Sequence, residues 1–89
     1  MNKSRDIVID SFISMGIQQI CRVPIIAVYE NPSDYPGKFV ARLWDIHKRP
    51  TRYVMVKDDL ESIRYSIPKT MKRMAPCPQD APMLVETWL

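Results

Sequence analysis

The sequence predicts an α+β fold, a two-layer sandwich in which an antiparallel sheet of about four strands carries its helices on one face. Residues 4–20 show helical spacing, and residues 58–67 combine a helix-start signal with an apolar stripe that ends at a proline. Four short apolar or alternating segments are bounded by turn residues, at 23–29, 38–44, 52–57 and 83–89. The expected element order is therefore (α)βββαβ.

Size and composition fit one ordinary globular domain. The chain has 89 residues, of which 46% are hydrophobic and 26% charged. Its apolar runs fall far short of the ~20 residues that cross a bilayer. Neither a signal peptide nor a framework of disulfides is expected, because acidic residues interrupt the N-terminal segment and there are two isolated cysteines. These features favour a reducing, cytoplasmic setting and no membrane partner.

The N-terminal segment is expected to be a helical extension of the domain. Isoleucines at spacings of three and four in residues 4–20 predict a helix, with Ser4 as its N-cap. Met15 could serve as an alternative start. We therefore divide the chain into an extension over residues 1–20 and an α+β domain over residues 22–89.

The central segments predict a meander of three antiparallel strands. The first is apolar and β-branched, and a proline-rich loop joins it to the second. The second strand, residues 38–44, alternates between two faces. Its core face holds Phe39, Ala41 and Leu43, and its other face holds Val40, Arg42 and Trp44. The second face meets either the N-terminal helix or a partner.

The strongest local signal lies at the start of residues 58–67. Asp58 is the expected N-cap, and Glu61 reaches back as in a capping box. The apolar stripe of Leu60, Ile63 and Ile67 would pack on the sheet before Pro68 ends the helix. Residues 69–82 are expected to form an extended loop, and residues 83–89 add the last strand.

Catalytic and metal chemistry find little support in the sequence. His47 is the one histidine and lies in a predicted turn, while Cys77 lies between two prolines. No ligand pair has the short spacing of a zinc site, and helix capping explains the acidic cluster at residues 58–61. We expect a protein that is not an enzyme, with no cofactor and no metal.

Basic residues suggest a nucleic-acid contact as one alternative. Ten of the 13 Lys and Arg residues fall within residues 38–73. They form two predicted basic loops, 47–52 and 69–73, with aromatic residues near them. The candidate contacts are Lys48, Arg49, Arg52, Lys69, Lys72 and Arg73.

Protein binding is the preferred reading. The two tryptophans share predicted strand faces with charged residues, and Trp and Arg are common interface anchors. The candidate interface is Arg42, Trp44, Glu86 and Trp88. If both tryptophans lie on the sheet face away from helix 58–67, they form a patch for another protein or for a second copy of the chain. If the N-terminal helix covers them, they are core.

Three quoted stretches also carry a resemblance. Residues 22–89 resemble a group of small single-domain proteins of Firmicutes and of their phages and mobile elements. The stretches that carry the resemblance are VYENPSDYPGKFVARLWD, KRPT-RYVMVKD and a terminal VETWL. The resemblance implies a compact domain in a bacterial or phage setting. It transfers no activity and no catalytic or binding residue.

Overall fold

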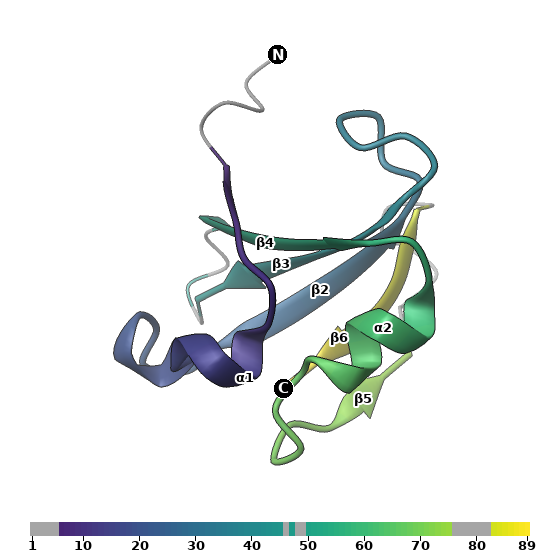
Figure 1. The fold of residues 1–89 in the computed structure, drawn as a ribbon. Coiled ribbons are helices and arrows are strands. Elements are labelled where there is room, and N and C mark those ends of the chain that lie inside the picture. The colour runs from purple at the N-terminus through teal and green to yellow at the C-terminus, as the bar shows by residue number, and fades with distance from the viewer. Residues whose placement is uncertain (1–5, 46, 48–49, 76–82) are drawn as a thin grey trace.

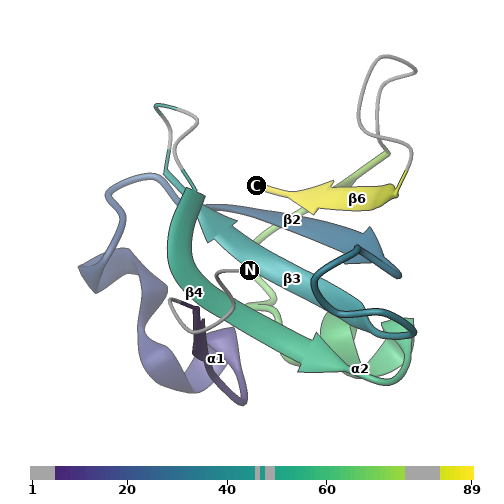
Figure 2. The same cartoon turned by 90° about the horizontal axis from the view of Figure 1, so that it is seen from above.

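A computed structural model describes residues 6–45, 47, 50–75 and 83–89, and these form a small α+β domain around a six-stranded mixed sheet (Figure 1). The strand order is β1-β4-β3-β2-β6-β5. The strands are β1 (Ile7–Val8), β2 (Ile25–Glu30), β3 (Phe39–Trp44), β4 (Pro50–Lys57), β5 (Arg73–Met74) and β6 (Leu84–Trp88). Figure 2, seen from above, shows β4, β3, β2 and β6 running side by side.

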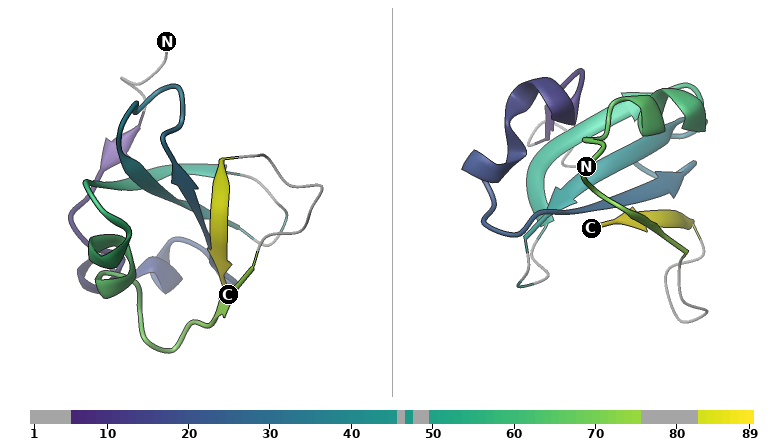
Figure 3. Two further views of the ribbon diagram at one scale, coloured as in Figure 1. Left: turned by 90° about the vertical axis from the view of Figure 1, so that its right-hand side faces the viewer. Right: turned by 90° about the horizontal axis from the view of Figure 1, so that it is seen from below.

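Short helices lie on one side of this sheet. They are α1 (Phe12–Met15), the 3-10 turn η2 (Ile17–Gln19) and α2 (Leu60–Tyr65). In Figure 1 both α-helices lie below the sheet, and the view from below in the right panel of Figure 3 shows them in front of the strands. The loop over residues 31–38 rises on the opposite side, so the predicted two-layer arrangement is present.

The four predicted strands are confirmed, but four strands are too few. The predicted loop 69–82 contributes β5, which pairs with β6. The second additional strand is β1, which pairs with β4 in the parallel sense through Ile7 and Tyr53, and makes the sheet mixed. The antiparallel meander of β2, β3 and β4 forms as expected.

The predicted N-terminal helix over residues 4–20 is present only in part, as α1 and η2. Ser11 caps α1 by accepting a hydrogen bond from the Ile13 N–H, and Gly16 ends it in the left-handed region at φ 69°. Residues 7 and 8 are β-branched and extend along β4. Ser4, the predicted cap, lies outside the described residues.

The helix predicted at 58–67 is present but shorter and capped one residue later. Asp59, not Asp58, accepts a hydrogen bond from the Ser62 N–H at 2.8 Å, and the helix covers residues 60–65. Asp58 instead forms an ion pair with Lys38. The predicted capping box of Asp58 and Glu61 is therefore wrong, because its register requires Asp58 to be the N-cap.

A single core lies between the sheet and the helices. It contains Ala41 and Leu43 from the predicted core face of β3, with Phe39 packed at its margin. The predicted stripe of α2 is also confirmed: Ile63 and Ile67 are buried, and Leu60 packs against the cluster.

The N-terminal segment contributes to the same core. Phe12, Ile17 and Cys21 are buried members of the cluster, and the Phe12 side chain has no exposed surface. Whether residues 22–89 fold without the preceding segment stays a prediction. In the structure, the described part of the predicted extension lies inside the domain.

Candidate interaction face of the sheet

The sheet has a second face that points away from the helices, and we call it the open face. Cross-strand register places its members in rows, with Tyr29 beside Val40 and Val56, and Ala27 beside Arg42 and Val54. Its residues are Ile25, Ala27, Tyr29, Val40, Arg42, Trp44, Val54, Val56 and Thr87. Arg42 is the one charged member of this set.

The charge of Arg42 is matched by the carboxylate of Asp6, which lies next to β1. The guanidinium donates from Nη1 to Oδ1 at 3.1 Å and from Nη2 to Oδ2 at 3.0 Å. It also donates to the carbonyl oxygen of Thr51 at 2.9 Å. The two-pronged geometry is that of a strong, oriented ion pair. Arg42 therefore joins the N-terminal segment to the middle of the open face.

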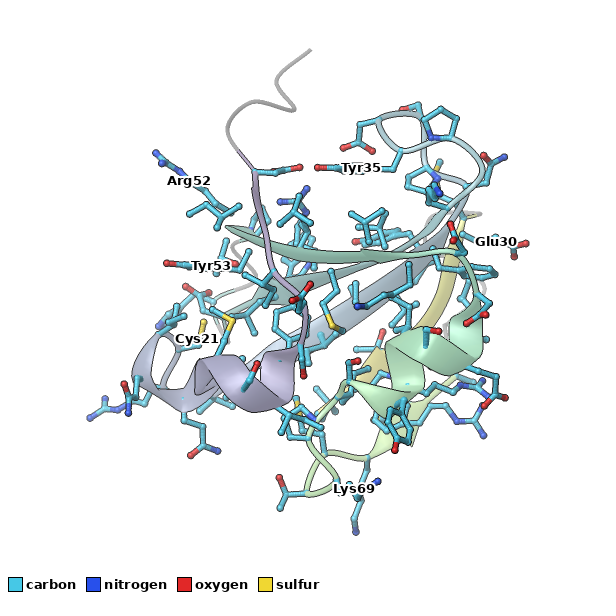
Figure 4. The ribbon with its side chains drawn as sticks, in the orientation of Figure 1. Cys21, Glu30, Tyr35, Arg52, Tyr53 and Lys69 are labelled. Carbon is cyan, nitrogen blue, oxygen red and sulfur yellow. The ribbon has the colours of Figure 1, made fainter. Side chains whose placement is uncertain are left out.

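Tyr35 completes this cluster from the loop over residues 31–38. Its hydroxyl donates to Oδ2 of Asp6 at 2.8 Å, and Figure 4 shows the ring pointing from the loop toward the N-terminal segment. Burial, the hydrogen bond to Asp6 and the negative charge of Asp6 raise the pKa of Tyr35 to about 12. Burial opposes ionisation of Asp6, but the hydrogen bonds from Arg42 and Tyr35 and the charge of Arg42 outweigh it, so the pKa of Asp6 lies below its ordinary value.

A hollow of about 440 Å³ lies beside the cluster, between the loop and the start of β6. Its apolar wall is formed by Tyr29, Val40 and the exposed side chain of Met83. The remaining lining residues are Pro32, Ser33, Asp34 and Arg42. The hollow is therefore an apolar depression lined by one acidic side chain, that of Asp34.

Trp44 lies at the other end of the open face, four residues from Val40 along β3. Its side chain is half-buried, and no acceptor within the described part of the chain pairs with its buried Nε1. A buried N–H without a partner costs about 1–3 kcal/mol. The position is therefore not optimised for the stability of the isolated chain.

Trp88 lies on the opposite face, so the two tryptophans do not form one patch. Trp44 pairs with Ile25 across the sheet, whereas Trp88 pairs with Ile26, and neighbouring strand residues point to opposite sides. Trp88 packs against the core and donates from Nε1 to Oε2 of Glu86 at 2.8 Å. The sequence allowed a patch with both tryptophans on the sheet face away from helix 58–67, and this patch is absent.

Glu86 is buried beneath α2 and is not part of an accessible surface. It is 2% exposed and accepts hydrogen bonds from Arg64, at 2.7 Å from Nη2 and 3.2 Å from Nε, with Arg73 Nη1 at 3.8 Å. Burial opposes its ionisation, but Arg64, Trp88 and Arg73 together hold the pKa of Glu86 below its ordinary value. This predicted interface residue instead joins α2 to β6.

The predicted nucleic-acid contacts are not gathered on one surface. Arg52 extends beside the N-terminal segment, on the side of the sheet away from the helices, whereas Lys69 lies at the opposite side of the molecule (Figure 4). Lys69 Nζ lies 5.7 Å from the centre of the Tyr65 ring, Lys72 pairs through its backbone with Leu89, and Arg73 approaches Glu86. Lys48 and Arg49 lie outside the described residues.

Groups with catalytic or metal-binding potential are scattered. His47 is exposed in a turn, Cys77 lies outside the described residues, and Cys21 is buried, where burial and then the charge of Asp45 raise the pKa of its thiol. In the part of the chain that the structure describes, no three His, Cys, Asp or Glu side chains cluster as metal ligands. No helix within the same ranges is long and apolar enough to cross a membrane.

Sequence patterns missed three features that adjoin the open face: Asp6, Tyr35 and the hollow. The alternation of residues 38–44 identified Arg42 and Trp44 but not their surroundings. Asp6 lies 36 positions from Arg42 and 29 positions from Tyr35 along the chain. A single acid in a segment with apparent helical spacing gives no signal of such a contact.

Comparison of the chain with protein-family models, with curated proteins and with solved structures finds no match. The resemblance to small proteins of Firmicutes and their mobile elements stays a prediction.

Proposed function

We propose that the protein is a non-catalytic binding module that works by association with a second copy of itself through the open face. The observation that carries this proposal is the apolar character of that face. Eight of the nine residues of the open face are uncharged and most are aliphatic or aromatic; Ala27, Val40 and Val54 are buried within the chain, and the other six are partly exposed. No helix covers this face in the described part of the chain (Figure 1).

The charge balance of the open face supports a second copy as the partner. Arg42, the one charged member of the nine residues, is neutralised within the chain by Asp6. Two such faces can therefore approach without leaving the charge of Arg42 unpaired. Face-to-face packing of two sheets is a common way to bury such a surface, and a symmetric dimer uses the same patch twice.

The nucleic-acid alternative has less support. The basic side chains proposed for it lie on different sides of the molecule, and Arg73 is drawn toward Glu86. Binding to phosphates would weaken steeply with added salt, whereas an apolar dimer would not. The two functions therefore differ in a simple measurement.

The first test is the concentration dependence of the molar mass, by sedimentation equilibrium at low and high salt. We expect a reversible dimer whose dissociation constant changes little with salt. Trp44→Ala should weaken it by more than about 30-fold, the effect of a hot-spot residue worth about 2 kcal/mol. Met83→Glu, at the other end of the face, should weaken it as well.

The matched control is Tyr65→Ala on α2, because Tyr65 is 79% exposed on the helix side of the molecule. It should leave the dimer intact. Circular dichroism of each variant separates loss of association from loss of folding. If Trp44→Ala does not fold, Met83→Glu still tests whether the open face forms the dimer. A wild-type chain that stays monomeric at all concentrations would refute self-association, and a salt-sensitive gel shift with nucleic acid would support the alternative.

A further inference from the structure

An apolar groove of about 360 Å³ lies on the helix side of the sheet, between α1 and the segment that follows α2. Its apolar lining residues are Phe12, Ile13, Ile17, Pro24, Pro68 and Met71. No charged side chain lines the groove among the residues that the structure describes. Because both α-helices lie below the sheet in Figure 1, the groove is separate from the open face.

Backbone hydrogen bonds hold both walls of the groove. The Phe12 N–H donates to the Ser66 carbonyl at 3.1 Å and ties α1 to the end of α2. The Met71 N–H donates to the Pro68 carbonyl at 3.1 Å and closes a turn in the other wall. Pro24 and Pro68 restrict the backbone further. A groove that is formed in advance binds a partner without the entropic cost of ordering its own walls.

Exposed apolar side chains border the groove. Ile13 lines it and is itself exposed, and Val23, which precedes Pro24, is exposed as well. Leu89 is a third exposed apolar residue, and it pairs through its backbone with Lys72, the residue after Met71. Apolar surface that is grouped in this way, rather than scattered singly, is typical of a site that binds another molecule.

The charged residues around the groove are mostly basic. Those within two positions of a lining residue are Asp10, Arg22, Lys69, Lys72 and Arg73. Arg73 approaches Glu86, but Arg22, Lys69 and Lys72 are exposed and form no ion pair within the described residues. An apolar groove with basic surroundings complements a ligand that combines apolar groups with negative charge.

We infer that the groove binds an acidic segment of a partner protein, whose large apolar side chains enter it while carboxylates face Arg22, Lys69 and Lys72. A concave site favours inserted side chains over the flat surface of a membrane. It also offers no ring on which a nucleic-acid base could stack, because Phe12, the aromatic lining residue, is fully buried. The inference does not depend on self-association, since the open face is on the other side of the sheet.

A phage-displayed library of random short peptides, selected against the immobilised full chain, is the probe that tests this inference. We expect the selected peptides to combine Leu, Ile, Met or Phe with Asp or Glu, and to bind more weakly as salt is added. Ile13→Asp should weaken their binding at least ~10-fold, because it places a like charge in the apolar groove. Lys69→Glu combined with Lys72→Glu should weaken it by at least ~10-fold as well.

The matched controls lie on the other side of the sheet. Arg52→Glu makes the same kind of charge reversal, and Met83→Glu places an acid at an exposed apolar residue. Both should leave the peptide affinity unchanged, and circular dichroism verifies that each variant folds. If Ile13→Asp does not fold, the double lysine variant still tests the site, because both of its side chains are exposed.

Selection of no acidic, apolar peptides would overturn the inference, and so would peptides that bind the groove variants as tightly as the wild type. Binding to phosphatidylglycerol vesicles or to a single-stranded oligonucleotide, without binding to peptides, would overturn it too and assign the basic residues to another kind of partner. A monomeric wild type that binds the selected peptides would refute the proposed function alone.

Discussion

At the scale of single residues, two carboxylate–guanidinium pairs hold the domain together, one on each side of the sheet. Asp6 and Arg42 attach the N-terminal segment to the open face, and Glu86 and Arg64 attach α2 to β6 beneath the helices. Each acid also accepts a hydrogen bond from an aromatic side chain, Tyr35 or Trp88. In both cases a largely buried charge is tolerated because its partners are oriented toward it.

These pairs predict that the domain loses stability in acid. The pKa values of Asp6 and Glu86 lie below their ordinary values of 3.8 and 4.5 in the folded chain. Between the folded and ordinary values the unfolded chain binds more protons, so stability rises with pH across that window. The contribution is fully present above the ordinary values and is lost as pH falls through the folded ones. Urea unfolding followed from pH 7 to pH 2 should show this decline.

Glu86→Gln isolates the share of Glu86 in this pH dependence. Loss of its charge should cost about 1–3 kcal/mol at pH 7, because Arg64 loses a charged acceptor. The difference from the wild type should shrink as pH falls through the lowered pKa of Glu86, because the wild-type carboxylate is then protonated as well. A difference that stays constant down to pH 2 would contradict a role for the charge.

At the scale of elements, the start of α2 shows how closely a sequence pattern can locate a helix and still miss its cap. Asp58 and Asp59 are adjacent acids, and both precede the apolar stripe. Lys38, at the end of the loop over residues 31–38, forms an ion pair with Asp58, and Asp59 caps the helix. The choice between them depends on a residue 20 positions away along the chain.

Asp59→Ala should therefore destabilise the domain more than Asp58→Ala. Loss of the cap leaves the Ser62 N–H without its acceptor and should lower Tm by several degrees, whereas loss of an exposed ion pair should lower it much less. Paired thermal unfolding of the two variants measures the difference directly. Equal shifts in Tm, or a larger shift for Asp58→Ala, would contradict Asp59 as the N-cap and favour Asp58, the residue that the sequence pattern predicted.

The same contrast between local and distant causes explains which elements the sequence predicts. The strands of the meander and the stripe of α2 follow from alternation and periodicity within a few residues, and the structure contains them. The N-terminal segment has isoleucines at helical spacing, but residues 7 and 8 gain more by pairing with the exposed edge of β4. The parallel pairing joins segments 46 residues apart, so it cannot be predicted from the pattern of either segment alone.

At the scale of the whole molecule, the open face was predictable in part. The alternation in β3 identified Arg42 and Trp44 as one face, because side chains of a strand alternate wherever the strand lies. The separation of Trp44 from Trp88 depends on the register between β2 and its two neighbours. The hollow depends on the way the loop over residues 31–38 lies above the sheet, which local propensities do not encode.

The most demanding prediction concerns the N-terminal segment as part of the whole fold. A chain that starts at Met15 lacks β1, the Asp6 carboxylate and Phe12, whose side chain is fully buried and whose N–H donates to the Ser66 carbonyl at 3.1 Å. Phe12→Ala alone should cost about 3–5 kcal/mol, against the ~5–15 kcal/mol that stabilises a typical domain. The shortened chain should therefore lack a cooperative unfolding transition in urea.

Ile13→Ala is the matched control for this experiment, because Ile13 is the next residue and its side chain is 51% exposed. It should change the free energy of unfolding by less than about 0.5 kcal/mol. If residues 15–89 unfold cooperatively with the midpoint of the full chain, the segment before Met15 is an appendage and the division near residue 20 describes the domain correctly. If they do not, the fold needs both its N-terminal strand and Phe12, because β4 then lacks its edge partner and the core its largest buried side chain.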